Sequence, residues 1–292
     1  MIPSFPDPKI VIPLTRSIIF LFALSSLILI YIVIRILYGA FPALISCLLI
    51  ISNPIFNLVS TRILGDPILL FFYSLFILLC ALYLKSRNNI FVFFAFIVSS
   101  LAFMTKLNGI LLVFMLFGIF LIKNKFSISK EDWKYLVAGI TAFLFISILL
   151  NPVFLNAGFK AIWRMVEVRF SAFRVYQETF KGAALLSIRE RFLVATQMIF
   201  FRYSFVYHFI KMPLELIMFV IGIYYIFKRR DLLLISILVF LVVIPISILP
   251  FNIPRYYYWI FPFIYIIAGL SLNFFKEVLS NKNSLLLKIR DK

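Results

Sequence analysis

Long apolar runs separated by short polar turns make up most of this chain. The runs span roughly 17–37, 40–59, 67–84, 90–104, 109–122, 135–150, 212–227, 232–249 and 256–275. Runs of this length and composition, recurring along a whole chain, are typical of transmembrane helices. The pattern predicts an all-α polytopic membrane helix bundle with about eight or nine transmembrane helices. Runs 90–104 and 109–122 are short for full spans, so we expect them to tilt little, to thin the bilayer locally, or to form a partly re-entrant hairpin.

One long segment, residues 151–211, departs from this pattern. An apolar set recurs at helical spacing and a charged set occupies the other faces: Phe159, Ile162, Trp163, Val166 and Phe170 against Arg164, Glu167, Arg174 and Glu178. The spacing predicts an amphipathic helix in the membrane interface, anchored by Trp163. A second interfacial helix is predicted over 188–209. These helices either cover a functional site or only seal the bundle. We expect one integral membrane domain over 1–292 with this segment as its large loop.

The distribution of Lys and Arg predicts the orientation of the chain. One set of alternate turns is rich in basic residues: Arg35, Lys85 and Arg87, and the stretches 123–134, 228–230 and 276–292. The positive-inside rule places this set in the cytoplasm. The other set (1–16, 60–66, 105–108, 151–211 and 250–255) is then extracytoplasmic, with the N-terminus outside. We expect a multi-pass protein of the plasma membrane.

Composition limits the classes of partner and of catalytic site that the chain can have. The chain is 64% hydrophobic and 14% charged, with a net charge of +18. Basic residues at the ends of membrane spans interact with the headgroups of membrane lipids. Because these residues lie in turns between the spans, they argue against nucleic acid as a partner. His208 is the single histidine, which excludes a His-based metal cluster or catalytic triad. Cys47 and Cys80 lie inside apolar runs and are expected to pack as small hydrophobes.

Four turns of the extracytoplasmic set carry the polar residues best placed for chemistry. They are Arg62 with Asp66; Thr105, Lys106 and Asn108; Asn151; and Asn252 with Arg255 and Tyr256. A carboxylate such as Asp66 can act as a general base or help to hold a divalent cation. Arg and Lys suit a phosphate leaving group, whose growing negative charge they stabilise. No cofactor is predicted beyond such a cation, and the metal requirement stays open.

Each of these residues also has a purely structural interpretation. Arg62 and Asp66 can pair across one turn, and Asp66 before Pro67 can be the N-cap of the next helix. Lys106 can extend to the headgroups. The stretch 255–259, Arg-Tyr-Tyr-Tyr-Trp, is also typical of an aromatic belt at the membrane interface.

The order of short motifs along the chain adds a family resemblance. The motifs are Pro13-Leu-Thr-Arg16, Ile34-Arg-Ile-Leu-Tyr-Gly39, Ser60-Thr-Arg-Ile-Leu-Gly-Asp66, Leu101-Ala-Phe-Met-Thr-Lys106, Pro254-Arg-Tyr256, Phe261-Pro262 and Ala268-Gly269. Together they resemble the membrane glycosyltransferases of GT-C fold, in particular the protein O-mannosyltransferase and aminoarabinose-transferase-like group.

The resemblance implies a function and a site. It implies inverting transfer of a sugar from a polyprenyl-phosphate donor to a protein, lipid or glycan acceptor at the extracytoplasmic face. Asp66 falls at the second acidic position of the family, which gives it a catalytic role. Arg62, Lys106, Arg255 and Tyr256 are then expected to bind the donor phosphate.

The start of the chain departs from the family pattern, and this departure bears on activity. The family begins with a cytoplasmic N-terminus, a first helix and a long outward loop that bears the principal catalytic Asp. This chain starts about where that loop ends, and the surroundings of Asp7 do not match. We therefore expect either a truncated enzyme or an inactive member. The alternative function is a non-catalytic polyprenyl-phosphate-binding protein or subunit. A transporter is disfavoured, because the runs hold almost no polar residues at mid-span.

Overall fold

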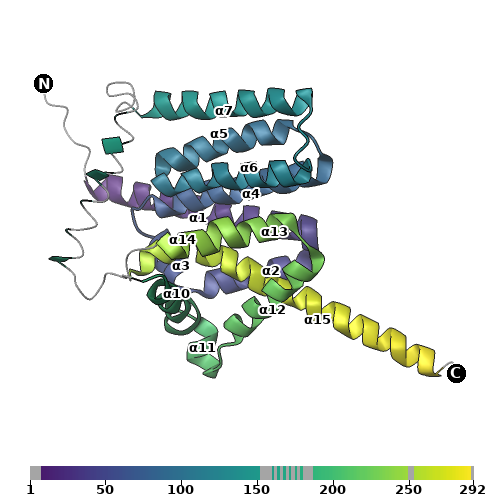
Figure 1. Ribbon diagram of the computed structural model, residues 1–292. Helices are drawn as coiled ribbons and strands as arrows, with labels where there is room; N and C mark the ends of the chain where they lie inside the picture. Colours follow the sequence, from purple (N-terminus) through teal and green to yellow (C-terminus); the bar gives the residue numbers. More distant parts are fainter. Residues whose placement is uncertain are drawn as a thin grey trace, which may run out of the picture.

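The computed structural model describes residues 8–151, 187–248 and 253–290, with isolated positions between 160 and 179. Every regular element in these stretches is a helix (Figure 1). The N-terminal half holds α1 (Pro8–Tyr38), α2 (Ala40–Ser52), α3 (Pro54–Ser60), α4 (Asp66–Ser86), α5 (Ile90–Thr105), the 3₁₀ turn η1 (Leu107–Gly109), α6 (Ile110–Lys123) and α7 (Lys130–Leu150). The predicted all-α fold class is confirmed.

The C-terminal half is built from shorter pieces. It holds α10 (Ile188–Gln197), η2 (Met198–Arg202), α11 (Phe205–Ile210), α12 (Leu214–Arg229), α13 (Leu232–Ile237), η3 (Leu238–Val243), α14 (Ile244–Ile248), the 3₁₀ turn η4 (Pro254–Tyr257) and α15 (Phe261–Arg290). The elements η2 and η3 are π-helical. Pro245 is the second residue of α14, just after η3, where a wider helical turn can accommodate the carbonyls that proline leaves without a donor.

Among the described residues, four helices are long and apolar enough to cross a membrane, namely α1, α4, α7 and α15. The pair α2–α3 makes a fifth span if its two parts are counted together. Three further apolar helices, Ile90–Thr105, Leu107–Lys123 and Leu232–Ser247, are shorter than that criterion. The short runs expected from the sequence are therefore short helices, and the total of about eight or nine spans stays a prediction.

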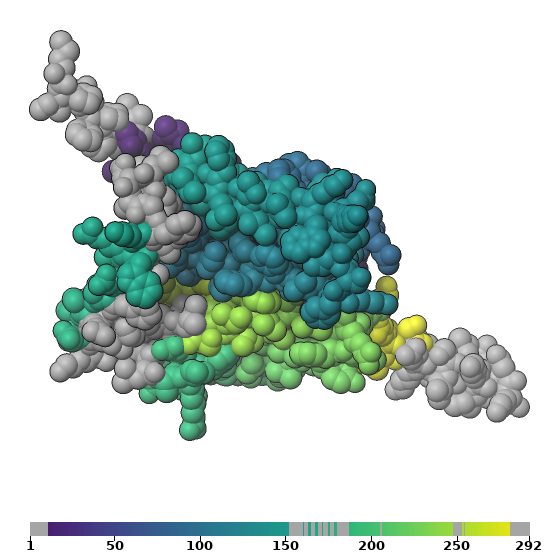
Figure 2. Space-filling model, turned by 45° about the horizontal axis from the view of Figure 1, so that its top comes forward, coloured from purple at the N-terminus to yellow at the C-terminus, as the bar shows by residue number. Residues whose placement is uncertain are grey.

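The helices run side by side in alternating directions, so that their turns collect at two ends (Figure 1). The turns 61–65 and 106–109 and the start of α10 lie together at one end, called here the Asp66 end. The basic turns at 87–89, 124–129 and 230–231 lie at the opposite end. The predicted sorting of turns into two sets is thus seen in the fold. Figure 2 shows α5 to α7, in blue and teal, against the green helices of the C-terminal half.

A bend separates α2 from α3, where the sequence predicted a single run over 40–59. The two helix axes differ by 69°. Asn53 lies at the bend, and its side-chain oxygen accepts a hydrogen bond of 2.8 Å from the backbone amide of Ile55. Pro54 follows as the first residue of α3, a position that suits its fixed φ. The bend directs α3 towards the loop that precedes Asp66.

The start of α15 and the turn before it form the centre of the packed core. Tyr257, Tyr258 and Trp259 are buried, and so are Phe261 and Tyr265. The interpretation of 255–259 as an aromatic belt is therefore wrong for Tyr257 to Trp259, because these rings pack inside the bundle and do not face lipid. Neighbouring helices, not the interface, hold this aromatic stretch.

The large loop is seen in part. The amphipathic helix predicted around Trp163 lies largely outside the described residues. The second predicted helix, 188–209, is present as α10 and α11, joined through η2. Ser187 begins α10 with a capping box in which the Glu190 side chain accepts from the backbone of Ser187.

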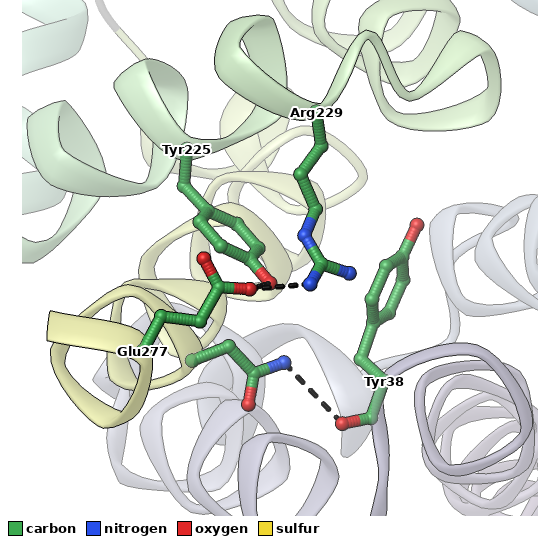
Figure 3. A network of polar contacts seen from close by, with 5 residues as sticks. Tyr38, Tyr225, Arg229 and Glu277 are labelled. Carbon is green, nitrogen blue, oxygen red and sulfur yellow. Dashed lines mark hydrogen bonds and ion pairs between the residues drawn. The ribbon is translucent and has the colours of Figure 1, made fainter. Parts of the chain in front are cut away.

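The opposite end of the bundle is tied together by polar side chains (Figure 3). Glu277 of α15 accepts a hydrogen bond of 3.1 Å from the hydroxyl of Tyr225 and pairs with Arg229, both on α12. Asn273 of α15 donates to the backbone carbonyl of Tyr38 at the end of α1 (3.3 Å). The Arg229–Glu277 ion pair connects α12 to α15. Because both of its charged groups are partly exposed to solvent, the pair contributes little to the free energy of folding.

Candidate functional site

An ion pair between α4 and the end of α5 is the centre of the Asp66 end. The ammonium of Lys106 lies 2.6 Å from Oδ1 of Asp66, and the side chains are 20% and 7% exposed respectively. Lys106 has an extended backbone (φ −160°, ψ 140°) between α5 and η1. This break in the helix turns the lysine away from the run of α5 and allows it to reach α4.

The local structure around Asp66 differs from each structural interpretation given by the sequence. Gly65 occupies the N-cap position of α4, and Asp66 is the first residue of the helix, so the N-cap prediction for Asp66 is wrong. The carboxylate still lies where the helix dipole favours negative charge. Asp66 pairs with Lys106 and, in the described part of the chain, not with Arg62. Lys106 is held by this pair instead of extending freely to the headgroups.

Tyr256 and Arg255 bring η4 to the same site. The Lys106 ammonium lies 5.5 Å from the centre of the Tyr256 ring, and the Arg255 guanidinium lies 5.2 Å from it. Arg255 also donates to the Tyr256 hydroxyl at 3.4 Å. Two cations thus share one aromatic ring, whose negative face attracts both of them. Four of the five predicted site residues come together in this way, from three elements that are distant in sequence.

Sequence reasoning did not single out one residue that senses the charge of Asp66, Tyr258. Tyr258 is buried, and its hydroxyl lies 3.0 Å from the hydroxyl of Ser60 at the end of α3. Its ring stacks on Phe56, with centroids 5.8 Å apart. Burial raises the pKa of Tyr258 far above its ordinary value, and the negative charge of Asp66 raises it further. Tyr258 therefore stays neutral and acts as a hydrogen-bonding group, not as an acid. The run of three tyrosines after Arg255 was the available signal.

The fifth predicted residue, Arg62, forms no hydrogen bond or ion pair with this cluster in the described part of the chain. Arg62 is exposed and lines a groove together with Arg16 and Leu58. None of the four residues of the cluster lines this groove. Of the other polar candidates, Asn151 is the C-cap residue that follows α7, and Asn252 lies outside the described residues. The carbonyl of Asn108 accepts a hydrogen bond of 2.8 Å from Tyr73, which supports the turn after Lys106.

The sequence left open whether the site binds a metal ion. Within the described residues, no three His, Cys, Asp or Glu side chains come together in a way that could hold one. Asp66 is the carboxylate of this site, and it is neutralised by Lys106. As described, the arrangement is suited to binding an anion next to a carboxylate.

Comparison with known proteins supports the resemblance drawn from the motifs. The family model of the dolichyl-phosphate-mannose-protein mannosyltransferases matches residues 14–150. That range includes Arg62, Asp66 and Lys106, whereas Arg255 and Tyr256 lie beyond it. No match is found among curated proteins.

Two solved structures share the fold over most of the chain. They are crystal structures of ArnT from Cupriavidus metallidurans, one in the apo state and one bound to undecaprenyl phosphate. Both superpose with a TM-score of 0.53 at 17% sequence identity. The match covers 88% of this chain and 45% of the apo structure, and 89% and 46% for the bound one. The chain therefore spans less than half the length of either structure. The expected GT-C-like membrane fold is confirmed.

Proposed function

We propose that this chain carries the donor site of a GT-C-type glycosyltransferase, which transfers a sugar from a polyprenyl-phosphate donor with inversion. The observation that carries the proposal is the partly buried Asp66–Lys106 pair beside Tyr256 and Arg255. The family match and the ArnT-like fold support the same class of reaction. The acceptor is a protein, lipid or glycan, and the site faces the extracytoplasmic side of the plasma membrane.

The two charges of the pair would have complementary roles. Asp66 accepts the proton of the acceptor group as that group attacks the anomeric carbon from the side opposite the phosphate. The bond from the anomeric carbon to the phosphate oxygen breaks, and the phosphate leaves with the electron pair. Lys106 and Arg255 stabilise the charge that grows on it. Because Lys106 is now paired with Asp66, a bound phosphate would compete with the carboxylate for the ammonium.

A second candidate function uses the same cations without chemistry. A polyprenyl-phosphate-binding protein or subunit needs Lys106, Arg255 and Tyr256 but no general base. This second function is favoured by the Asp66–Lys106 ion pair, in which the carboxylate that would serve as the base is already engaged by an ammonium. The two candidates differ in what removal of the Asp66 charge does.

Sugar transfer by the wild-type chain separates the two candidates, and Asp66→Asn tests whether Asp66 is the base. If Asp66 is the base, the variant should lose sugar transfer by about 100-fold or more. Its affinity for undecaprenyl phosphate should be unchanged or higher, since Lys106 is released from its partner. Lys106→Met should instead weaken binding of undecaprenyl phosphate about tenfold. Binding is measured on the purified chain in detergent, and transfer as loss of sugar from a labelled polyprenyl-phosphate sugar.

Glu131→Gln is the matched control, because it makes the same acid-to-amide change at an exposed position of α7. It should leave both measurements unchanged. If wild type binds undecaprenyl phosphate and releases no sugar, the non-catalytic function holds. Transfer by Asp66→Asn at the wild-type rate would show that Asp66 is not the base, and undiminished binding by Lys106→Met would contradict the phosphate site.

A further inference from the structure

A groove with two arginines lies at the Asp66 end, between residues 16–21 of α1 and residues 58–62 at and just after the end of α3. Its volume is about 710 Å³, and Arg16 and Arg62 line it together with Phe20, Leu21 and Leu58. Arg62 was expected to serve the sugar donor, but its groove is not lined by any residue of the Asp66–Lys106 cluster. The groove is therefore a second place where an anion could bind.

The charge in this groove is one-sided. Both charged groups among its described lining residues are guanidinium groups. Neither Arg16 nor Arg62 forms an ion pair or a side-chain hydrogen bond with another residue in the described part of the chain. Two like charges at one groove repel each other, and an anion between them would remove that repulsion. Phosphate fits best, because the planar guanidinium presents paired donors to its oxygens.

The depth of Arg16 points to a lipid and not to a free anion. Arg16 is the sixth residue of the candidate span Val11–Tyr38. At 1.5 Å per residue it lies about 7 Å along the helix from the start of the span, near the boundary between headgroups and acyl chains. A charge at this depth is costly unless it is paired. In a bilayer, the phosphate groups of lipids are the nearest anions.

The floor of the groove is apolar and open. Phe20 is 47% exposed, Leu21 58% and Leu58 40%. Exposed apolar side chains next to two cations make a surface that is complementary to an amphiphile with a phosphate headgroup. A free phosphate would leave these side chains uncovered.

We propose that this groove binds one phospholipid of the adjoining leaflet. The phosphate lies between Arg16 and Arg62, and an acyl chain lies along Phe20, Leu21 and Leu58. The lipid bridges α1 and α3, and Arg62 serves this lipid instead of the sugar donor. The proposal is independent of the glycosyltransferase reaction, since it concerns other residues and predicts binding alone.

Native mass spectrometry of the detergent-purified chain, titrated with phosphatidylglycerol, tests the site. Wild type should retain one molecule of this lipid, and Arg16→Ala and Arg62→Ala should each weaken its binding about tenfold. Arg→Lys at either position should weaken it less. Leu58→Trp should also weaken binding by filling the floor. Diacylglycerol, which lacks the phosphate, and glycerol 1-phosphate, which lacks the tails, should each bind at least tenfold more weakly than phosphatidylglycerol.

Arg35→Ala is the matched control, because it removes the same charge from an exposed position at the other end of α1. It should leave phosphatidylglycerol binding unchanged, and equal loss in Arg35→Ala would mean that only net charge matters, which overturns the proposal. Glycerol 1-phosphate binding as tightly as the lipid would also overturn it, in favour of a free-anion site. So would loss of phosphatidylglycerol binding in Lys106→Met, which would join the groove to the donor site.

Discussion

At the residue scale, the Asp66–Lys106 pair is best understood through what surrounds it. A partly buried carboxylate and ammonium would each be costly alone, and together they neutralise each other. The Tyr256 ring lies near two cations, Lys106 and Arg255, and its π-face offsets part of their mutual repulsion. A phosphate that enters this site would meet both cations at once.

The Tyr256 ring should therefore matter more than its hydroxyl. We expect Tyr256→Leu to weaken undecaprenyl phosphate binding about 2- to 10-fold, because the ring no longer holds the two cations near each other. Tyr256→Phe keeps the ring and loses the hydroxyl that accepts the long hydrogen bond from Arg255, so it should bind within about 2-fold of wild type. Titration of the purified variants with undecaprenyl phosphate measures both. Equal losses in the two variants would show that the hydroxyl, not the ring, carries the effect.

At the element scale, close helix contacts decide where the site residues lie. Gly109 ends the turn η1, and a Cβ there would lie 2.3 Å from the backbone of Ala102 and Phe103. This contact lets the chain fold back tightly after Lys106. Gly222 plays the same part between α12 and α15, where a Cβ would lie 2.0 Å from the carbonyl oxygen of Ile267. α15 follows the turn that carries Arg255 and Tyr256, so its packing positions one side of the site.

Gly222→Ala should force α12 and α15 apart. The expected loss is about 1–3 kcal/mol of unfolding free energy, because the added methyl meets a rigid backbone. Gly118→Ala is the control: its Cβ would lie 3.7 Å from the Phe240 ring, an ordinary contact, so it should be neutral or slightly stabilising. Unfolding by SDS titration in mixed micelles gives both values. A Gly222→Ala protein as stable as wild type would contradict the close packing of these helices.

At the scale of the whole molecule, the fold separates the turns into two ends. The Asp66 end holds the site and the arginine groove, and the opposite end holds most of the basic turns and the network around Glu277 (Figures 1 and 3). If the helices lie across a bilayer, the positive-inside rule places the Asp66 end outside. That sidedness follows from charge counts and is open to a direct test.

Cysteine labelling in intact cells tests the sidedness. The native Cys47 and Cys80 are buried, so they should contribute little background. A cysteine placed at exposed Thr61 should react with a membrane-impermeant maleimide, whereas one at exposed Asn88 should react only after permeabilisation. The reverse pattern would invert the proposed orientation and place the site in the cytoplasm.

The sequence by itself determined the all-helical class, the positions of most helices and the polar turns in which chemistry can occur. These are local properties: the length of an apolar run, the position of a proline and the order of short motifs along the chain. Even the partition of the turns into two sets needed only the alternation of the helices and the counts of Lys and Arg.

Only the tertiary structure decided which of the polar residues meet. Arg62 and Asp66 share one turn, yet Asp66 pairs with Lys106 from another helix, and Arg62 lines a groove with Arg16. The bend at Asn53 and the burial of Tyr258 could not be predicted from the sequence either. The physical reason is that an ion pair depends on where a side chain points after helices pack. That packing follows from contacts such as that of Gly222 with Ile267, which join residues far apart along the chain.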